Sequence, residues 1–225
     1  MRIRITFVKQ GALRYTGHLD LHKLWERAAR RAELPLAYSQ GFHPQPKMNM
    51  AAALPLGFSS RCEVMDMKLE RDISLEDLPA RLNTTLPSGL QVVEVEQVDE
   101  RAPALQTQVA SAEYEVTLTE DMDRTELEQK IDSVMHSTSL PRERRGKTYD
   151  LRPLLEELKL RPDGRIFMRL AAREGATGRP EEVLDVLGIA FEETRIERTR
   201  LIFKSTEDRS PDEDQRQLGQ TSNTE

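Results

Sequence analysis

The apolar residues near the start of the chain change from a period of two to a helical period, and this change limits the fold more than any other feature. In residues 2–8, Ile3, Ile5 and Phe7 fall on one side of an extended chain, as they do in a strand with one buried face. In residues 19–32 the apolar side chains return at helical spacing, with a proline soon after the last of them. The sequence therefore predicts a strand followed by an amphipathic helix that packs on it.

The following residues extend this pattern to a complete unit. Residues 48–54 and 62–69 are predicted strands, residues 74–86 a helix and residues 90–98 a last strand, with turns rich in glycine, proline and serine between them. The order strand–helix–strand–strand–helix–strand is that of a ferredoxin-like βαββαβ unit, predicted over residues 1–98.

The second half of the chain shows a looser version of the same order. A linker rich in alanine, glutamine and proline is predicted at residues 99–111, and a second ferredoxin-like unit at residues 112–204. Residues 205–225 hold six acidic residues and almost no apolar ones, which is typical of a disordered tail. The predicted fold class is α+β, with two tandem ferredoxin-like units.

Charge is distributed unevenly along the 225 residues. The formal net charge is −6, yet residues 1–50 carry nine lysines and arginines against three acidic residues, a net of +6. A basic block in an acidic protein is typical of a surface for a polyanion such as RNA, or for an acidic partner. A solvated helix face that balances acids elsewhere accounts for the same charges.

The connection between the first strand and the first helix, residues 9–18, is the first candidate site. Its two glycines allow close backbone approach, and the helix N-terminus offers unpaired N–H groups beside Lys9, Arg14 and His18. This combination suits a phosphate, although it matches neither the P-loop nor the dinucleotide fingerprint. An ordinary glycine-containing turn is the alternative.

The first helix is the second candidate. Its cations fall on one stripe, which serves either as a phosphate track or as a solvated face; they are Lys23, Arg27, Arg30 and Arg31. His18 and His22 have a spacing found in metal sites, but no third ligand accompanies them, so no metal and no cofactor is predicted.

The loop at residues 38–47 is the third candidate. A glycine and two prolines give it a rigid, extended backbone. It carries Tyr38, Phe42, His43 and Lys47, and rings beside a cation on a rigid loop suit the stacking of single-stranded RNA. His43 would also serve as a general acid or base, and a purely structural loop remains open. The fold is expected to bring this loop beside the 9–18 turn, so that both form one nucleotide pocket.

A second basic cluster lies in the other half of the chain. It consists of Arg142, Arg144, Arg145, Lys147 and Arg152. Nearby, Arg165, Arg169 and Arg173 alternate along a predicted strand and share one face. Both halves are thus expected to expose arginines on or near a sheet.

Cysteine usage and hydropathy bear on the compartment. The single cysteine, Cys62, excludes an internal disulfide, and no apolar run approaches the roughly 20 residues that span a bilayer. The start of the chain reads as a strand and lacks the layout of a signal peptide. A cytoplasmic location without membrane contact is expected. Without a Cys-x3-Cys-x2-Cys run, the chain cannot hold a radical-SAM iron–sulfur cluster of its own.

Several of these stretches resemble one family. FVKQGALRYTGHLDL (7–21), AYSQGFHPQPK (37–47) and PLG (55–57), together with residues 27–32, 34–35, 63, 66, 144–147 and 150–153, are similar to the radical-SAM-linked domain of unknown function. That domain occurs fused downstream of B12-binding radical SAM proteins or as a separate chain beside them. The resemblance covers residues 1–204 and implies a separate radical SAM protein as partner, but no reaction. Genes of this family often lie beside an RNase E/G-type ribonuclease, which favours RNA as a second partner.

Three functional hypotheses follow from these features. The leading one is a non-catalytic, RNA-binding accessory subunit that works with a separate radical SAM enzyme in RNA modification or processing. The second is a metal-independent endoribonuclease that uses His43, because the CRISPR repeat-processing endoribonucleases, which this chain resembles more weakly, are also tandem ferredoxin-like proteins. The third is a protein-interaction module that binds no nucleic acid.

Overall fold

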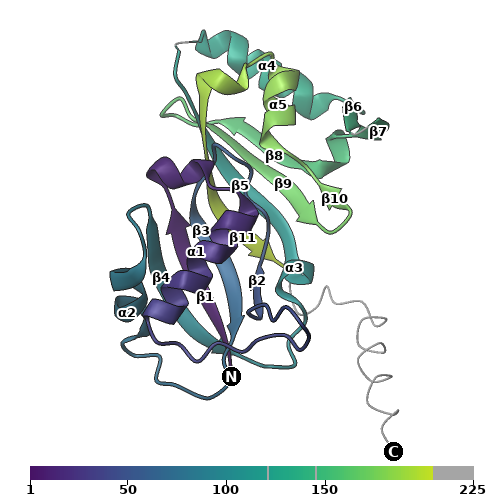
Figure 1. Cartoon of the computed structure of the whole chain (residues 1–225). Coiled ribbons are helices and arrows are strands. Elements are labelled where there is room, and N and C mark those ends of the chain that lie inside the picture. Colours follow the sequence, from purple (N-terminus) through teal and green to yellow (C-terminus); the bar gives the residue numbers. More distant parts are fainter. Residues whose placement is uncertain (121, 145, 205–225) are drawn as a thin grey trace, which may run out of the picture.

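The computed structural model describes residues 1–120, 122–144 and 146–204. Arg145 and the predicted tail at residues 205–225 lie outside the described residues. Within them, the chain forms a mixed α+β structure around one large, mostly antiparallel sheet (Figure 1). The α+β class predicted from the sequence is confirmed. None of the helices in the described part is long and apolar enough to cross a membrane.

The first half places helices on a four-stranded sheet. Its elements are β1 (Arg2–Lys9), the short 3-10 helix η1 (Gly11–Tyr15), α1 (His18–Arg31), β2 (Met48–Met50), β3 (Ser59–Lys68), α2 (Leu78–Thr85) and β4 (Leu90–Val98). The strand order is β4-β1-β3-β2, and every pair is antiparallel. The predicted alternation of β1 buries Ile3, Ile5 and Phe7 beneath α1. Trp25 of α1 is fully buried against the Phe7 ring, at 4.8 Å between centroids.

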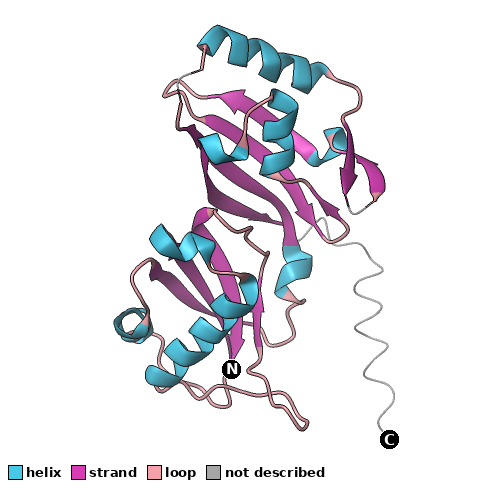
Figure 2. Ribbon diagram, turned by 45° about the horizontal axis from the view of Figure 1, so that its top comes forward, coloured by secondary structure: helices cyan, strands magenta, loops and turns pink. Residues whose placement is uncertain are grey.

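The second half repeats this element order with a hairpin added. Its elements are α3 (Leu105–Gln108), β5 (Val109–Leu118), α4 (Arg124–His136), β6 (Pro141–Arg144), β7 (Lys147–Asp150), the 3-10 helix η2 (Arg152–Leu154), β8 (Leu155–Leu160), β9 (Ile166–Arg173), β10 (Ala176–Thr177), α5 (Pro180–Leu187), the 3-10 helix η3 (Phe191–Glu193) and β11 (Thr194–Phe203). The larger strands follow the order β8-β9-β5-β11. Asp123 caps α4, since its carboxylate accepts the Glu126 N–H at 2.9 Å. Figure 2 shows the helices of each half lying over strands of that half.

The two halves share one sheet. A short parallel pairing of β11 with β3 joins Glu197 to Ser59 and Arg198 to Ser60. At this seam the Glu63 carboxylate accepts from the Arg198 Nε at 2.9 Å, although the two residues are 3% and 1% exposed. Buried charges persist only when they are paired in this way. The predicted linker at residues 99–111 contains α3 and the first residues of β5, because the chain forms a helical turn and rejoins the sheet at once.

Candidate nucleic-acid interface

The 9–18 turn and the 38–47 loop lie at opposite ends of the first-half sheet. Lys9, at the end of β1, pairs with Ser60, whereas Arg2, at its start, pairs with Lys68. The Lys68 N–H donates to the carbonyl of Lys47, which places the loop at the Arg2 end. Seven residues of strand separate the two ends by about 23 Å.

The expected single pocket formed by the turn and the loop is therefore wrong. The 14-residue α1 runs back antiparallel to β1 for about 21 Å, so whatever follows it begins at the other end of the sheet. In Figure 1, η1 lies beside the second half of the molecule, and the loop lies near the N-terminus.

Lys9 is not a surface cation. Its side chain is 1% exposed, and its Nζ donates to the carbonyl of Thr16 at 3.0 Å. Burial lowers the pKa of Lys9, while the nearby Glu63 carboxylate raises it in part. Lys9 therefore fastens the connection between β1 and α1, and its predicted role as an exposed phosphate ligand is wrong because the sheet seam covers it.

The other two candidate residues of the 9–18 turn, Arg14 and His18, are closer to solvent. The Arg14 guanidinium lies 4.7 Å from the centre of the Tyr15 ring and donates to the Tyr15 hydroxyl at 2.9 Å. His18 is exposed at the first residue of α1. Further along, the His22 Nε2 lies 3.3 Å from the carbonyl of Met48. The described residues contain no group of three or more histidines, cysteines or carboxylates placed to hold a metal ion.

The 38–47 loop is closed on itself and tied to the end of α1. The Ser39 N–H donates to the carbonyl of Gln45, and the Tyr38 hydroxyl accepts from the Arg30 Nε at 3.0 Å. Phe42 is fully exposed at the tip, and His43 and Lys47 are also exposed. The loop thus joins Tyr38 to Arg30 but leaves its other predicted residues apart from the 9–18 turn.

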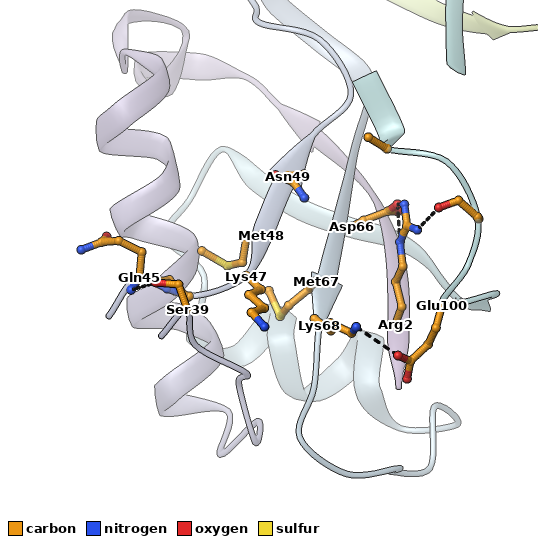
Figure 3. A pocket seen from close by; sticks show the side chains of 13 residues that line it. Arg2, Ser39, Gln45, Lys47, Met48, Asn49, Asp66, Met67, Lys68 and Glu100 are labelled. Atoms are coloured by element: carbon orange, nitrogen blue, oxygen red, sulfur yellow. Dashed lines mark hydrogen bonds and ion pairs between the residues drawn. The ribbon is translucent and has the colours of Figure 1, made fainter. Parts of the chain in front are cut away.

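A pocket of about 340 Å³ separates this loop from β3 and the segment after β4 (Figure 3). Two of the three cations that line it already form ion pairs. Arg2 forms an ion pair with Asp66 at 2.6 Å, and Lys68 with Glu100 at 3.1 Å. Only Lys47, among the described cations that line it, lacks an acidic partner. This pocket therefore offers little net charge to a polyanion.

A different groove runs along α1 and past the end of α2. It has a volume of about 580 Å³, and we call it the α1 groove; its lining residues are Thr16, Asp20, Lys23, Leu24, Arg27, Arg31, Thr85, Leu86 and Pro87. Lys23, Arg27 and Arg31 are exposed and four residues apart, so they follow one helix face at steps of about 6 Å. Within the described residues none of these three side chains makes an ion pair or hydrogen bond. Three cations on one face repel one another, and a phosphate backbone would relieve that repulsion.

The remaining member of the predicted helix stripe differs from these three. Arg30 forms an ion pair with Glu26 at 2.8 Å in addition to its hydrogen bond with Tyr38. The Tyr38 and Glu26 contacts raise the pKa of Arg30. Arg30 therefore belongs to the support of the 38–47 loop.

Several arginines on or beside the second-half sheet form ion pairs, whereas Arg173 and Arg195 are exposed and have no acidic partner within the described residues. Arg169 contacts Glu113 at 2.6 Å, and Arg165 contacts Asp163 at 2.6 Å and also Glu115. We call this surface the arginine face; it comprises Arg61, Arg161, Arg165 and Arg169 with Glu113, Glu115, Glu157, Asp163 and Glu197. Its positive charge is balanced by carboxylates, so it is a poor phosphate track.

Arg142, Arg144 and Arg152 of the second basic cluster also have partners within the structure. Arg144 forms an ion pair with Glu182 at 2.6 Å, and Arg142 pairs with Asp185 at 2.8 Å, which holds the β6–β7 hairpin on α5. Burial and the adjacent Glu182 raise the pKa of Tyr149 to about 12. Arg152 donates to the carbonyls of Leu155 and Met135, while Lys147 is exposed.

Two features of the site were not predicted from the sequence. One is the pairing of the arginine face, although Glu113 and Glu115 alternate on β5 and Glu113 lies opposite Arg169 of the neighbouring β9. The other is a pocket between η1 and η3, whose lining residues Arg14 and Arg195 lie 181 positions apart in the sequence and give no local signal. Both require knowledge of which strands are neighbours.

The chain belongs to a family of uncharacterized proteins conserved in bacteria (DUF2344). The family model matches residues 2–180, which include the α1 groove and most of the second half. No curated protein matches the chain. Among solved structures, a chain in the crystal structure of a Cbf5-Nop10-Gar1 complex is similar at 8% identity with a TM-score of 0.43. The match covers 88% of the present chain and 48% of that chain, so this chain spans about half the length of that neighbour. A likeness at this TM-score carries no argument about function.

Proposed function

We propose that this protein is a non-catalytic RNA-binding subunit and that the RNA backbone lies in the α1 groove. The proposal rests on one observation, namely which cations have an acidic partner and which have none. Lys23, Arg27 and Arg31 have no acidic partner within the described residues, whereas the arginines of the arginine face have one or more each. Phosphates would neutralise the three groove cations and release condensed counterions, which favours binding.

The lining of the groove suits a single strand without sequence preference. Leu24, Leu86 and Pro87 offer apolar contact to sugars or bases beside the cations. Asp20 is the one carboxylate among the residues that line it. Backbone contacts of this kind position a nucleic acid but do not read its bases.

The geometry favours binding over catalysis. The groove lining contains no histidine or cysteine. His43, the candidate acid or base, lies on the exposed loop at the other end of the sheet and has no hydrogen-bond partner within the described residues to orient it. General acid–base catalysis needs a positioned group, so the endoribonuclease alternative has less support.

Two finer statements are part of this proposal. The partner enzyme is a separate radical SAM protein, an inference that rests on the resemblance of the sequence blocks alone. The two halves are tandem ferredoxin-like units, which is supported by their common element order and by the equivalent strand orders β4-β1-β3-β2 and β11-β5-β9-β8.

The salt dependence of RNA binding tests the proposal. We expect the affinity of the full chain for an unstructured RNA to fall linearly on a log–log plot with a slope of about −2, because three contacts to a single strand contribute about 0.7 each. Absence of binding at about 50 mM salt, or binding that does not respond to salt, would overturn it. Affinity purification from the native cell tests the partner, with the radical SAM protein as the expected co-purified chain.

A further inference from the structure

A pocket lies where the two halves of the molecule meet, and we call it the junction pocket. It has a volume of about 380 Å³ and lies between η1, the Gly57 turn, η3 and the start of β11. Its lining residues are Arg14, Tyr15, Gly57, Thr119, Phe191, Glu192, Thr194 and Arg195. The first three come from the first half and the others from the second, so the pocket exists only in the assembled chain.

Two cations line the junction pocket. The Nε of Arg14 is buried and has no hydrogen-bond partner, although its Nη2 donates to the Tyr15 hydroxyl. A ligand oxygen in the pocket would supply the acceptor that this buried donor lacks. Arg195 is exposed and has no acidic partner within the described residues. The pair offers a site for an anion.

Two exposed rings accompany these cations. Tyr15 is 63% exposed and Phe191 is 38% exposed. Gly57 lies between them with φ of +87°: a Cβ there would come within 3.3 Å of the Phe191 Cζ and 4.0 Å of the Tyr15 Cε1. Phe191 also stacks on the buried Phe58, at 5.9 Å and 23° between the rings. Glycine thus lets two aromatic edges approach one another beside two arginines.

The walls of the pocket are held in place before any ligand binds. The Gly57 N–H donates to the carbonyl of Arg14 at 2.9 Å, and the Gln10 N–H donates to the carbonyl of Gly89 at 2.8 Å, so η1 is fastened on both sides. On the opposite wall, the Thr194 hydroxyl donates to the carbonyl of Phe191 at 2.7 Å. A pre-organised site loses less entropy on binding.

We infer that the junction pocket binds one ribonucleotide. The base stacks on Tyr15 or Phe191, the phosphate accepts hydrogen bonds from Arg14 and Arg195, and the Glu192 carboxylate accepts one from a ribose hydroxyl. Arginine with aromatic rings is the combination that holds unpaired nucleotides in proteins that bind single strands.

This inference adds to the proposed function, on which it rests for the direction in which the RNA strand runs along α1. Thr16 lines the α1 groove and directly follows Tyr15 of the junction pocket. An RNA whose backbone follows Arg31, Arg27 and Lys23 along α1 therefore reaches the junction pocket next. The pocket receives the nucleotide at that end of the bound segment.

Calorimetric titration of the full chain with the four nucleoside 5′-monophosphates tests the inference. We expect saturable binding that Tyr15→Leu or Phe191→Leu weakens by about 5- to 150-fold, since stacking on one ring contributes about 1–3 kcal/mol. Arg195→Gln is expected to reduce the preference for the monophosphate over its nucleoside, since Arg14 remains to bind the phosphate. Arg165→Gln, on the arginine face, serves as the control with the same change of charge and should leave mononucleotide binding unchanged. Because Tyr15 is largely exposed, its variant keeps the test valid if Phe191→Leu lowers stability.

The outcomes separate the two proposals. RNA binding by the wild-type chain without saturable mononucleotide binding would overturn the junction pocket and leave the α1 groove intact. Mononucleotide binding without RNA binding would overturn the proposed function alone. Mononucleotide binding that Arg27→Gln in the α1 groove abolishes, while Tyr15→Leu and Phe191→Leu leave it unchanged, would place the nucleotide in that groove and contradict the inference.

Discussion

The α1 groove and the arginine face contain similar cations in opposite surroundings. On the arginine face each arginine meets a carboxylate of a neighbouring strand or turn, as Arg169 meets Glu113 at 2.6 Å. In the α1 groove three cations follow one helix face without a partner among the described residues. A paired arginine stabilises the fold, whereas unpaired cations at i,i+4 spacing destabilise a helix slightly. The difference teaches that pairing, more than the number of arginines, indicates where a polyanion binds.

Among the paired arginines, Arg198 is buried together with its partner Glu63. Glu63→Gln leaves a guanidinium that is 1% exposed without a counter-charge, and we expect the free energy of unfolding to fall by about 3–5 kcal/mol. Chemical denaturation measures this change. The double variant Glu63→Leu with Arg198→Met removes both charges and should lose much less. A loss below about 1 kcal/mol for Glu63→Gln would show that this pair does not depend on its counter-charge.

Neutralising the α1 groove should have the largest effect on binding. The triple variant Lys23→Gln, Arg27→Gln and Arg31→Gln is expected to weaken RNA binding roughly 100-fold at about 0.1 M salt, because each lost contact removes about 0.7 units of salt slope. Fluorescence anisotropy over a salt series measures both quantities.

The matched control for the groove variant lies on the arginine face. The triple variant Arg61→Gln, Arg165→Gln and Arg169→Gln changes the net charge by the same amount but removes cations that are already paired. RNA affinity should change by less than about twofold, since only long-range attraction is altered. Equal losses in the two triple variants would mean that net charge alone governs binding, and the comparison would fail.

The sequence predicted much of the fold because the first half follows local rules. The alternation of β1 and the helical period of α1 were both confirmed. The site was predicted less well. Lys9 lies in a polar turn of the sequence, but the pairing of β3 with β11 buries it at a seam that no local pattern indicates.

Contacts between residues that are far apart in the sequence also explain which features the sequence did not predict. The partners of Arg144 and Arg169 lie 38 and 56 positions away, so a basic cluster in the sequence became a set of ion pairs in the structure. The groove cations were predicted as a stripe because helical spacing alone places them on one face. That they lack partners is visible only once the elements are packed.

The two surfaces are also expected to differ, by a smaller amount, in how much their cations contribute to the free energy of unfolding. Arg169→Gln leaves Glu113, whose side chain is 12% exposed, without its ion pair, and we expect a loss of about 1 kcal/mol because Arg169 itself is partly screened by solvent. Arg27→Gln should change the free energy of unfolding by less than about 0.5 kcal/mol, or raise it slightly by removing like-charge repulsion with Lys23 and Arg31. Thermal unfolding of both variants measures the difference. A groove variant that is less stable than the Arg169 variant would indicate a structural role for the groove cations.

The smallest expected effect is the change of RNA affinity with pH. It distinguishes RNA binding by the α1 groove from RNA binding by the histidines. Between about pH 5.5 and 8, lysine and arginine side chains ordinarily keep their charge, whereas histidine gains a proton as the pH falls. Hydrogen bonds from Lys159 and Arg165 lower the pKa values of Glu157 and Asp163, respectively. Carboxylates with a lowered folded pKa contribute stability above their unfolded pKa and lose it only as the pH falls through the folded value, so the Glu157–Lys159 and Asp163–Arg165 pairs stay intact throughout this range. RNA affinity at constant salt should therefore be flat across it. An affinity that rises below about pH 6.5, and that His18→Gln or His43→Gln flattens, would place an imidazolium on the RNA and move the interface away from the α1 groove.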